Sequence, residues 1–127
     1  MNAPNPRPIA IIHRAAGDPS RHQALGPYFI EALIDESEEG AGTVWRIRLA
    51  PNQRTQTSFH RVAEEYYYVL LGNGTAILNG VEHPLSPGDF LRLPPDTRHA
   101  FFTADEPLEM LNVHTPGCRP NRDTYFE

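Results

Sequence analysis

Apolar and polar residues alternate along much of this chain, with the period of two that a half-buried β-strand requires. The clearest case is TVWRIRLA at 43–50, where Trp45 and Ile47 share one face and Arg46 and Arg48 share the other. An α-helix would place its apolar residues three or four positions apart instead. The pattern therefore predicts a strand with one face in a core and the other in solvent.

Turn residues separate further segments of the same kind. EYYYVLL (65–71) is rich in residues that favour strands and ends at a Gly-Asn-Gly turn, and TAIL runs into Asn79-Gly80, a strong hairpin signal. IAIIH at 9–13 is predicted as a first strand, whereas YFIEALI at 28–34 fits either a strand or a short helix. The other predicted strands are TSFHR, DFLRL, HAFFT and LEMLNVH, with HPLSPGD (83–89) as a turn.

These segments add up to about eight to ten short strands, at the spacing of a β-sandwich or barrel. The 13 prolines in 127 residues support this, because proline interrupts helices and central strands but suits turns. The length fits one domain, so we expect residues 1–127 to form a single all-β domain. Residues 1–8, MNAPNPRP, are predicted to be a flexible arm.

The composition narrows the functional classes. Hydrophobic residues make up 39% and charged residues 21%, which is typical of a soluble globular protein. A net charge of −5 argues against binding nucleic acid, which needs clustered lysine and arginine. No segment reaches the length of a membrane span, and the first residues lack the apolar stretch of a secretory signal. With a single cysteine, Cys118, no internal disulfide can form, and we expect a cytoplasmic protein.

Candidate chemistry is concentrated in FHRVAEEYYYVLLGNG, residues 59–74, where a histidine and two acids precede an apolar strand. Polar groups beside a core need a partner. His60 ends one predicted strand and Glu65 begins the next, so their side chains can meet across adjacent antiparallel strands, about 5 Å apart. His99, from a third strand, comes near when a barrel closes. The residues alone leave a metal site and a simple ion pair both open.

The spacing of these residues resembles the two motifs of the cupin superfamily. Ser58-Phe59-His60, four residues, Glu65, six residues and Gly72 follow the first motif. The second motif is followed by Gly88, Pro94, His99 and the residues between them, with Asp96 and Thr103 where the family has glycine and asparagine. The resemblance covers about residues 43–116 and implies a double-stranded β-helix, or jelly-roll barrel.

The resemblance also implies a divalent metal ion, such as Fe, Mn, Ni or Zn. In cupins, two histidines and the glutamate of the first motif, with the histidine of the second, bind the metal. Carried over to this chain, His60, Glu65 and His99 are retained, whereas Ser58 stands where the first histidine belongs. Two imidazoles and one carboxylate suit a metal with open positions. Ser58 or Gln56, on the same strand face as His60, is a possible auxiliary ligand.

Other residues are candidates for chemistry or substrate binding. Tyr67 shares a strand face with Glu65, and either Tyr67 or His114 is suited to proton transfer. For substrate binding the candidates are Phe101 and three arginines, whose guanidinium groups suit a carboxylate. Each also has a structural alternative, since the arginines can face solvent and the phenylalanine can belong to the core. The arginines are Arg46, Arg48 and Arg92, and Cys118 is predicted to be an inert thiol.

The main functional hypothesis is a metal-dependent enzyme acting on a small organic molecule. The resemblance allows isomerase, cyclase, lyase, decarboxylase or dioxygenase chemistry without choosing among them. The alternative is a non-catalytic cupin module that binds a small ligand and has lost full metal coordination, and a purely structural β-sandwich is a third possibility. Exposed edge strands and the apolar segment at 9–12 predict a homodimer.

Overall fold

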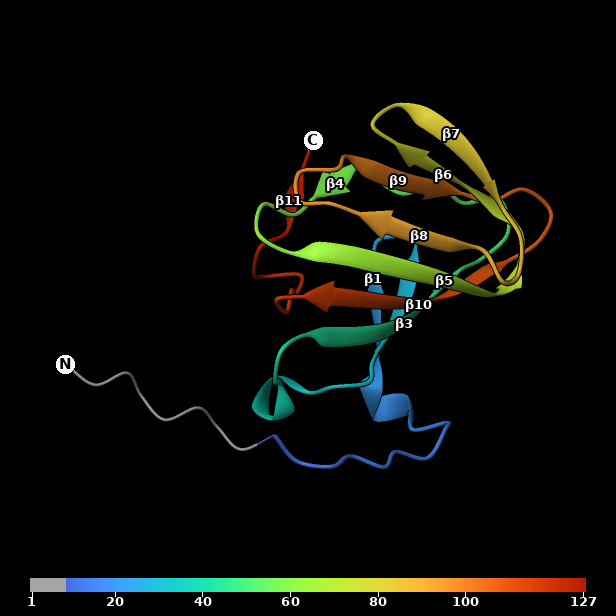
Figure 1. Ribbon diagram of the computed structural model, residues 1–127. Coiled ribbons are helices and arrows are strands. Elements are labelled where there is room, and N and C mark those ends of the chain that lie inside the picture. The colour runs from blue at the N-terminus through green and yellow to red at the C-terminus, as the bar shows by residue number, and fades with distance from the viewer. Residues whose placement is uncertain (1–8) are drawn as a thin grey trace.

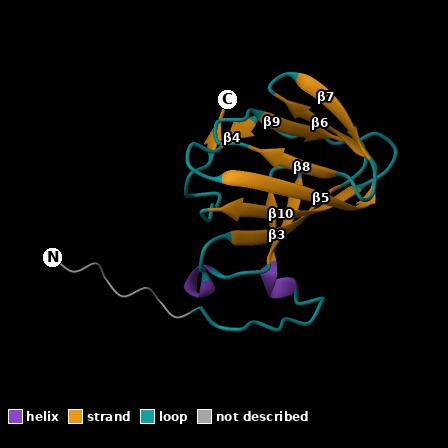
Figure 2. Cartoon of the chain, in the orientation of Figure 1, coloured by secondary structure: helices purple, strands orange, loops and turns teal. Residues whose placement is uncertain are grey.

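The computed structural model describes residues 9–127 and is built almost entirely of β-strands joined by turns (Figures 1 and 2). Two short 3₁₀ helices, η1 and η2, precede the third strand. No helix within the described residues is long and apolar enough to span a bilayer. The elements are η1 (Pro19–Arg21), β1 (His22–Leu25), β2 (Tyr28–Ala32), η2 (Glu36–Glu38), β3 (Thr43–Leu49), β4 (Ser58–Phe59), β5 (Glu64–Gly72), β6 (Gly74–Leu78), β7 (Val81–Leu85), β8 (Phe90–Leu93), β9 (His99–Phe102), β10 (Leu108–Thr115) and β11 (Tyr125–Phe126).

The strands form two antiparallel sheets that face each other, as the jelly-roll prediction requires. The larger sheet has the order β1-β2-β3-β10-β5-β8, and the smaller has the order β11-β4-β9-β6-β7. In Figure 1 the smaller sheet lies above β8, β5, β10 and β3 of the larger one. Neighbours in a sheet are mostly distant in sequence, because the chain crosses repeatedly from one sheet to the other. The fold is therefore the all-β jelly-roll barrel of the cupins.

Side chains on the inner faces of both sheets form one core. On β3, Trp45 and Ile47 point inward while Arg46 and Arg48 are exposed, which confirms the predicted alternation. Val69 and Met110 continue this face of the larger sheet, and the smaller sheet contributes Phe101 to the same core. Because side chains alternate strictly along a strand, the same inward face also carries the polar residues of β5 and β10 into the barrel.

The hairpins follow from their turn residues. Asn79 and Gly80 both have positive φ, 47° and 81°, and pair Leu78 with Val81 at the tip of the β6–β7 hairpin. Residues with positive φ at both central positions match the right-handed twist of the flanking strands. The predicted Asn-Gly hairpin is thus present.

Two predicted elements need correction, and the structure decides a third that the sequence left open. IAIIH at 9–13 forms no strand: Ile9 and Ile11 are exposed, and the described chain offers this segment no pairing partner. The first strand is instead β1, and YFIEALI contributes a strand, β2, because it pairs on one side with β1 and on the other with β3. HPLSPGD is only partly a turn, since its first three residues belong to β7. The predicted arm at 1–8 lies outside the described residues.

After β10 the chain turns back towards the barrel instead of leaving it. A cis peptide bond joins Thr115 to Pro116, and residues 117–124 run without regular structure to β11. There Tyr125 pairs with Phe59 and Phe126 with Ser58, so that the C-terminal strand extends the smaller sheet at its β4 edge (Figure 1). The last residues of the chain are thereby placed beside the end of β4, where His60 lies.

Two glycines with similar φ angles allow a matched test of backbone packing. Gly72 has φ +79° and an added Cβ would collide with the carbonyl oxygen of Pro107, whereas Gly80 has φ +81° and open space around the same position. We expect Gly80→Ala to lower the free energy of unfolding by about 1 kcal/mol through backbone strain alone. Gly72→Ala should lower it by about 2–4 kcal/mol, because the clash adds to the strain. Urea denaturation of both variants measures the difference, and equal losses would contradict the close approach of Pro107.

Candidate metal centre

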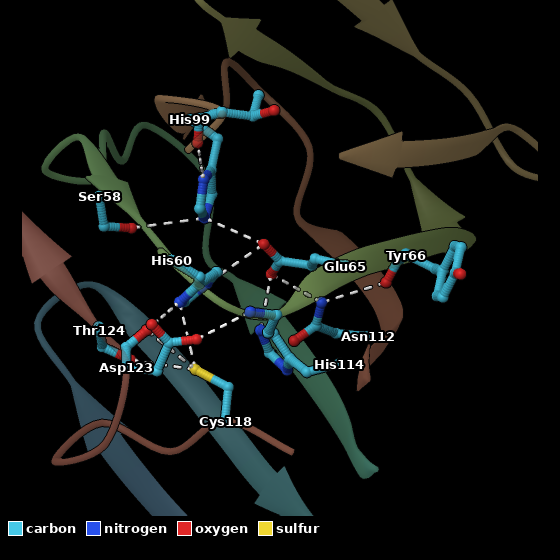
Figure 3. A network of polar contacts seen from close by, with 12 residues as sticks. Ser58, His60, Glu65, Tyr66, His99, Asn112, His114, Cys118, Asp123 and Thr124 are labelled. Carbon is cyan, nitrogen blue, oxygen red and sulfur yellow. Dashed lines mark hydrogen bonds and ion pairs between the residues drawn. The ribbon is translucent and has the colours of Figure 1, made fainter. Parts of the chain in front are cut away.

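A buried carboxylate lies at the centre of the barrel, surrounded by three imidazoles (Figure 3). Glu65 is 2% exposed and points inward because it shares a face of β5 with Tyr67 and Val69. His60 follows β4, and its Nε2 is 3.2 Å from Glu65 Oε2. His99 Nε2, from β9, is 3.4 Å from the same oxygen, and His114 Nε2, from β10, is 3.0 Å from Oε1. Residues from both sheets therefore converge on one carboxylate.

The other ring nitrogens of two histidines fix which atoms face the carboxylate. His60 Nδ1 lies 2.7 Å from the carbonyl oxygen of Asp123, and His99 Nδ1 lies 3.0 Å from that of Thr97. A carbonyl oxygen can only accept, so in each case Nδ1 carries the proton and donates it. In the neutral rings the Nε2 atoms then present lone pairs towards Glu65. This arrangement is typical of histidines that bind a metal through Nε2.

The contact between Glu65 Oε2 and the two Nε2 atoms requires a proton or a cation between them. Glu65 Oε2 has only lone pairs, as do the Nε2 atoms of His60 and His99 in their neutral forms, and these atoms face each other at 3.2 and 3.4 Å. Glu65 Oε2 and His114 Nε2 are the buried side-chain atoms that lack a hydrogen bond within the described residues. Opposed lone pairs repel unless a proton or a cation joins them, so the cluster is a receptor for positive charge.

The donor atoms also have the spacing that a metal ion demands. Ligand atoms about 2.1 Å from an ion lie about 3.0 Å apart at a right angle and about 3.4 Å apart at the tetrahedral angle. The separations of 3.2 and 3.4 Å around Glu65 Oε2 fall in this range. His60, Glu65 and His99 offer ligand atoms that all lie within 4.8 Å of one another. These residues therefore fit a two-histidine, one-carboxylate centre.

Electrostatics favour the ionised carboxylate. Burial alone raises the pKa of a carboxyl group, but attraction to the neighbouring His99, His114 and His60 imidazoles outweighs it and holds the pKa of Glu65 well below its usual range. For His60, burial lowers the pKa, whereas the neighbouring Cys118 sulfur and Glu65 carboxylate raise it to about 11. Burial, and then the charge of Glu65, raise the pKa of Tyr67 well above its usual value, so this phenol keeps its proton.

Asn112 holds the carboxylate in place from the neighbouring strand. Its Nδ2 donates to Glu65 Oε1 at 3.0 Å and to the carbonyl oxygen of Tyr66 at 3.1 Å. Asn112 lies opposite Tyr67 in the β10–β5 register, and its inward position follows from the alternation that also places His114 inward. The hydrogen bond to Oε1 leaves Oε2 directed at His60 and His99.

The cluster lies at the inner end of a cavity of about 240 Å³. Much of the remaining wall is apolar, from strands β1 to β3, and the C-terminal segment closes one side. The residues that line the cavity are Leu25, Gly26, Pro27, Tyr28, Ile30, Trp45, Ile47, Gln56, Ser58, His60, Glu65, Tyr67, His99, Asn112, His114, Cys118, Arg119, Pro120, Thr124 and Phe126. A small organic molecule can therefore reach the carboxylate and imidazoles from an apolar pocket.

The C-terminal segment contributes functional contacts that the sequence did not indicate. Asp123 supplies the carbonyl oxygen that orients His60, and its side chain accepts backbone N–H groups of residues 61, 62 and 63 at 2.8–3.2 Å. Cys118 is buried, with Sγ 3.2 Å from His60 Nδ1 (Figure 3). Cys118 was predicted to be an inert thiol, and nothing in the sequence placed it near His60, because sequence patterns carry no signal for contacts between residues about 60 positions apart.

Aromatic stacking secures the same segment to the barrel. The rings of Phe59 and Tyr125 stack with centroids 5.4 Å apart. The guanidinium of Arg98 lies 3.6 Å from the Phe59 ring centre, and that of Arg61 lies 4.3 Å from the Tyr125 ring centre. Arg98 therefore lies over the Phe59 ring, whereas Arg61 lies beside the stack, 5.9 Å from the Phe59 ring centre as well, and both cations are attracted to the aromatic faces. The stack holds Tyr125, two residues after Asp123, against Phe59.

Most of the predicted site residues gather around the cavity. Tyr67 and His114 line it beside Glu65, and so do Gln56 and Ser58. Ser58 Oγ is 3.4 Å from His99 Nε2, which places it next to a candidate ligand. Gln56 donates instead to the C-terminal carbonyl oxygen of Glu127. Their proposed roles as catalytic groups or auxiliary ligands stay predictions.

The four predicted substrate-binding residues do not line the cavity. Arg46 and Arg92 are exposed on the outer face of the larger sheet, where they pair with Glu109 and Glu64, and Arg48 is exposed on the same face. Strand alternation places them there, because Ile47 and Leu93 next to them point inward. Phe101 is fully buried against Tyr67, with ring centroids 4.9 Å apart, and belongs to the core.

The route by which His60 meets Glu65 also differs from the prediction. We expected neighbouring strands of one sheet, but β4 belongs to the smaller sheet and β5 to the larger one. The two side chains meet across the interior because the turn between them crosses from sheet to sheet. His99 and Ser58 do pair across adjacent strands, since β4 and β9 are neighbours.

The fold and site together define a class of small β-barrel proteins with a histidine and carboxylate cluster inside the barrel. The chain belongs to the cupin family: the cupin domain family matches residues 45–114. Protein SchB of Streptomyces halstedii is 30% identical over 96 residues, which cover 74% of this chain and 70% of SchB. Quercetin 2,3-dioxygenase of Bacillus subtilis (strain 168) is 36% identical over 59 residues, covering 46% of this chain and 18% of the dioxygenase.

Solved structures agree on the fold. The Streptomyces nucleoside dehydratase Pac13 superposes with a TM-score of 0.72 at 20% identity, over 91% of this chain and 92% of Pac13. The DMSP lyase DddQ from Ruegeria pomeroyi DSS-3 gives a TM-score of 0.69 at 21% identity, over 79% of this chain and 51% of the lyase. At such identities the likeness establishes the barrel and leaves the activity of this chain open.

The pKa of Asp123 predicts how the C-terminal contact depends on pH. Burial raises this pKa, but hydrogen bonds from the N–H groups of Ala63, Arg61 and Val62 outweigh burial and lower it. The contribution to stability is therefore complete above the unfolded-state pKa of about 3.9 and is lost as the pH falls through the lower folded-state value. At pH 7 we expect Asp123→Asn to lower the free energy of unfolding by about 1–3 kcal/mol.

The difference between wild type and variant should shrink below about pH 3.9, where the wild-type carboxylate also becomes neutral. Denaturant unfolding across this pH range measures it. Asp105→Asn, at an exposed position, is the matched control and should leave stability nearly unchanged. A difference that stays constant with pH would show that the carboxylate charge does not hold the segment.

Proposed function

We propose that this cupin is a metal-dependent enzyme acting on a small organic molecule, with His60, Glu65 and His99 holding a divalent ion. One observation carries the proposal: the lone pairs of two oriented imidazoles face a buried carboxylate oxygen that accepts no hydrogen bond among the described residues. A cation at this point would satisfy all three groups at once. Fe, Mn, Ni and Zn are all compatible with this donor set.

When bound, such an ion would supply Lewis-acid activation of a substrate carbonyl or carboxylate group, or redox chemistry if it is iron. The chain itself supplies the remaining functions. The apolar wall excludes water and the second carboxylate oxygen stays tied to Asn112 and His114. His114 is the candidate for moving a proton, because its Nε2 lies beside Glu65 Oε1 within the cavity. Tyr67, which keeps its proton, is suited to donating a hydrogen bond to a substrate oxygen.

The reaction type stays open among isomerase, cyclase, lyase, decarboxylase and dioxygenase chemistry. Structural relatives include a nucleoside dehydratase, of which a variant is seen with uridine, and a DMSP lyase. A cupin described as a sugar phosphate isomerase, from Silicibacter pomeroyi, has a TM-score of 0.66 at 26% identity, over 80% of this chain and 66% of its own. All act on small molecules, which supports the substrate size that we propose here.

A binding module without metal is the second candidate, and one observation favours it. The pKa of His60 is raised to about 11, so a proton on this imidazole could join the opposed lone pairs without any ion. Ser58 occupies the position of a family histidine, so one metal ligand of the family is missing, which also favours the binding module. In this case the barrel would store or sense a small ligand in the same cavity.

Metal content separates the two candidates. We expect protein purified without added metal to carry about one divalent ion per chain by elemental analysis. His60→Ala, His99→Ala and Glu65→Gln should each reduce that content to about one-tenth or less, because each removes one of three ligands. His114→Ala should retain the metal and lose only turnover, provided that this residue transfers a proton.

The control is His83→Ala, which changes an exposed histidine of β7 far from the cluster and should keep full metal content. It corrects for nonspecific binding to imidazole groups. Metal-free wild-type protein whose fold and ligand binding are unaffected by chelation would contradict the enzyme proposal and support the binding module.

The predicted homodimer is retained as a proposal. The larger sheet exposes Tyr68, Leu70 and Phe90 on its outer face, at 47%, 42% and 60%, and such a cluster is often covered by a partner. Light scattering during size-exclusion chromatography should give twice the mass of one chain, and Phe90→Lys should shift it towards one chain. A wild-type protein with the mass of a single chain would show that this face stays open.

A further inference from the structure

The cavity has two chemically different sides, and only one of them is explained by the metal centre. On the other side, Tyr28, Ile30, Trp45 and Ile47 of β2 and β3 form a largely apolar wall, to which Phe126 of the C-terminal strand is added. An engineered cavity of about 150 Å³ is enough to hold benzene. The 240 Å³ available here therefore suits an apolar body of one or two rings.

One cationic side chain lies in this wall. Arg119 is the only lysine or arginine among the described residues that line the cavity, and it is 8% exposed. Its guanidinium lies 5.7 Å from the centre of the Trp45 ring, on the apolar side of the pocket. The arginines that the sequence nominated for substrate binding point to solvent, so Arg119 is the residue in a position to take that role.

Glu39 and the backbone of Ile34 hold the Arg119 guanidinium in place and accept hydrogen bonds from some of its N–H groups. Nε and Nη2 both lie 3.0 Å from Glu39 Oε1, and Nη2 also donates to the carbonyl oxygen of Ile34 at 3.3 Å. Within the described residues no hydrogen bond uses Nη1. The fixed orientation means that little freedom is lost when a ligand binds to the remaining donors.

Glu39 interacts with Arg122 as well as with Arg119. Both of its oxygens accept hydrogen bonds from Arg122 Nη2, at 2.6 and 2.7 Å, and the charge of Glu36 also acts on Arg122. Because the carboxylate is shared between two guanidinium groups, Glu39 alone does not balance the charge of both. A buried positive charge in this state favours an anionic partner.

We propose that the cavity takes a small carboxylic acid whose apolar body of one or two rings lies along Trp45 and whose carboxylate binds Nη1 of Arg119. The proposal rests on the proposed function, since the body of the ligand would extend to the Glu65 cluster. A carboxylate suits the site better than a phosphate, because Nη1 offers only two N–H donors and a phosphate dianion needs more partners when buried. Arg119 is thus a specificity-determining residue.

Trp45 provides the measurement, because it is the only tryptophan in the chain and lies in the cavity wall. Naphthoate and its neutral isostere naphthamide are titrated against the full chain while tryptophan fluorescence is followed. Chelated protein is used first, so that a carboxylate bound to a metal cannot imitate one bound to Arg119. We expect naphthoate to bind about ten- to a hundredfold more tightly than naphthamide.

Arg119→Met should abolish this preference, whereas Arg48→Met, which removes an exposed guanidinium on the outer face of the larger sheet, should keep it. Arg119→Lys keeps the charge and should retain a reduced preference, so it tests the proposal even if the methionine variant does not fold. Equal affinity of wild type for the two ligands, or an unchanged preference in Arg119→Met, would overturn the proposal. Tighter binding of naphthyl phosphate than of naphthoate would overturn the carboxylate assignment.

The outcome is separable from that of the metal proposal. Suppose that Glu65→Gln and chelated wild type both prefer naphthoate, and that no metal is found in the purified protein. The Arg119 carboxylate site is then supported and the metal-dependent enzyme is contradicted. If metal is bound at the predicted centre but the ligand preference does not depend on Arg119, the reverse holds.

Discussion

The structure depends on one electrostatic constraint, which is that a carboxylate buried in the barrel must meet positive charge. Glu65 is removed from water by the same strand alternation that buries Tyr67 and Val69, and an unpaired carboxylate there would cost several kcal/mol. Three imidazoles and the Asn112 amide surround it from both sheets. The polar cluster therefore ties the sheets together at the point where the chemistry is expected, and either a proton or a metal ion completes it.

The chain beyond the region shared with the cupin family completes this centre. The backbone carbonyl oxygen of Asp123 accepts a hydrogen bond from His60 Nδ1. The Asp123 side chain accepts hydrogen bonds from backbone N–H groups in the turn that follows His60. One residue thus fixes both the backbone and the ring of a candidate ligand. The same segment supplies Arg119 and Phe126 to the cavity wall, so that the proposed metal ligation and ligand selection would both depend on residues 118–127.

The division of the cavity into a polar and an apolar side follows from the two pairs of strands that build it. Strands β5 and β10 carry polar residues on their inner faces, whereas β2 and β3 carry Ile30, Trp45 and Ile47. A substrate that contacts both sides would place its reactive group at Glu65 and its apolar body against Trp45. In the proposed function, burial on one side would bind the ligand and charge on the other would act on it.

Local sequence patterns determined much of this protein. Alternation in TVWRIRLA and EYYYVLL specified which side chains enter the barrel, Asn79-Gly80 specified a hairpin, and the motif spacing specified the cupin barrel and singled out His60, Glu65 and His99. The tertiary structure alone decided that His60 meets Glu65 from the opposite sheet, that Arg46, Arg48 and Arg92 face solvent, and that Cys118, Arg119 and Asp123 reach the site. The physical reason is range: periodicity and turn chemistry act over a few residues, whereas these contacts join positions brought together only when the sheets pack and the C-terminal strand pairs with β4.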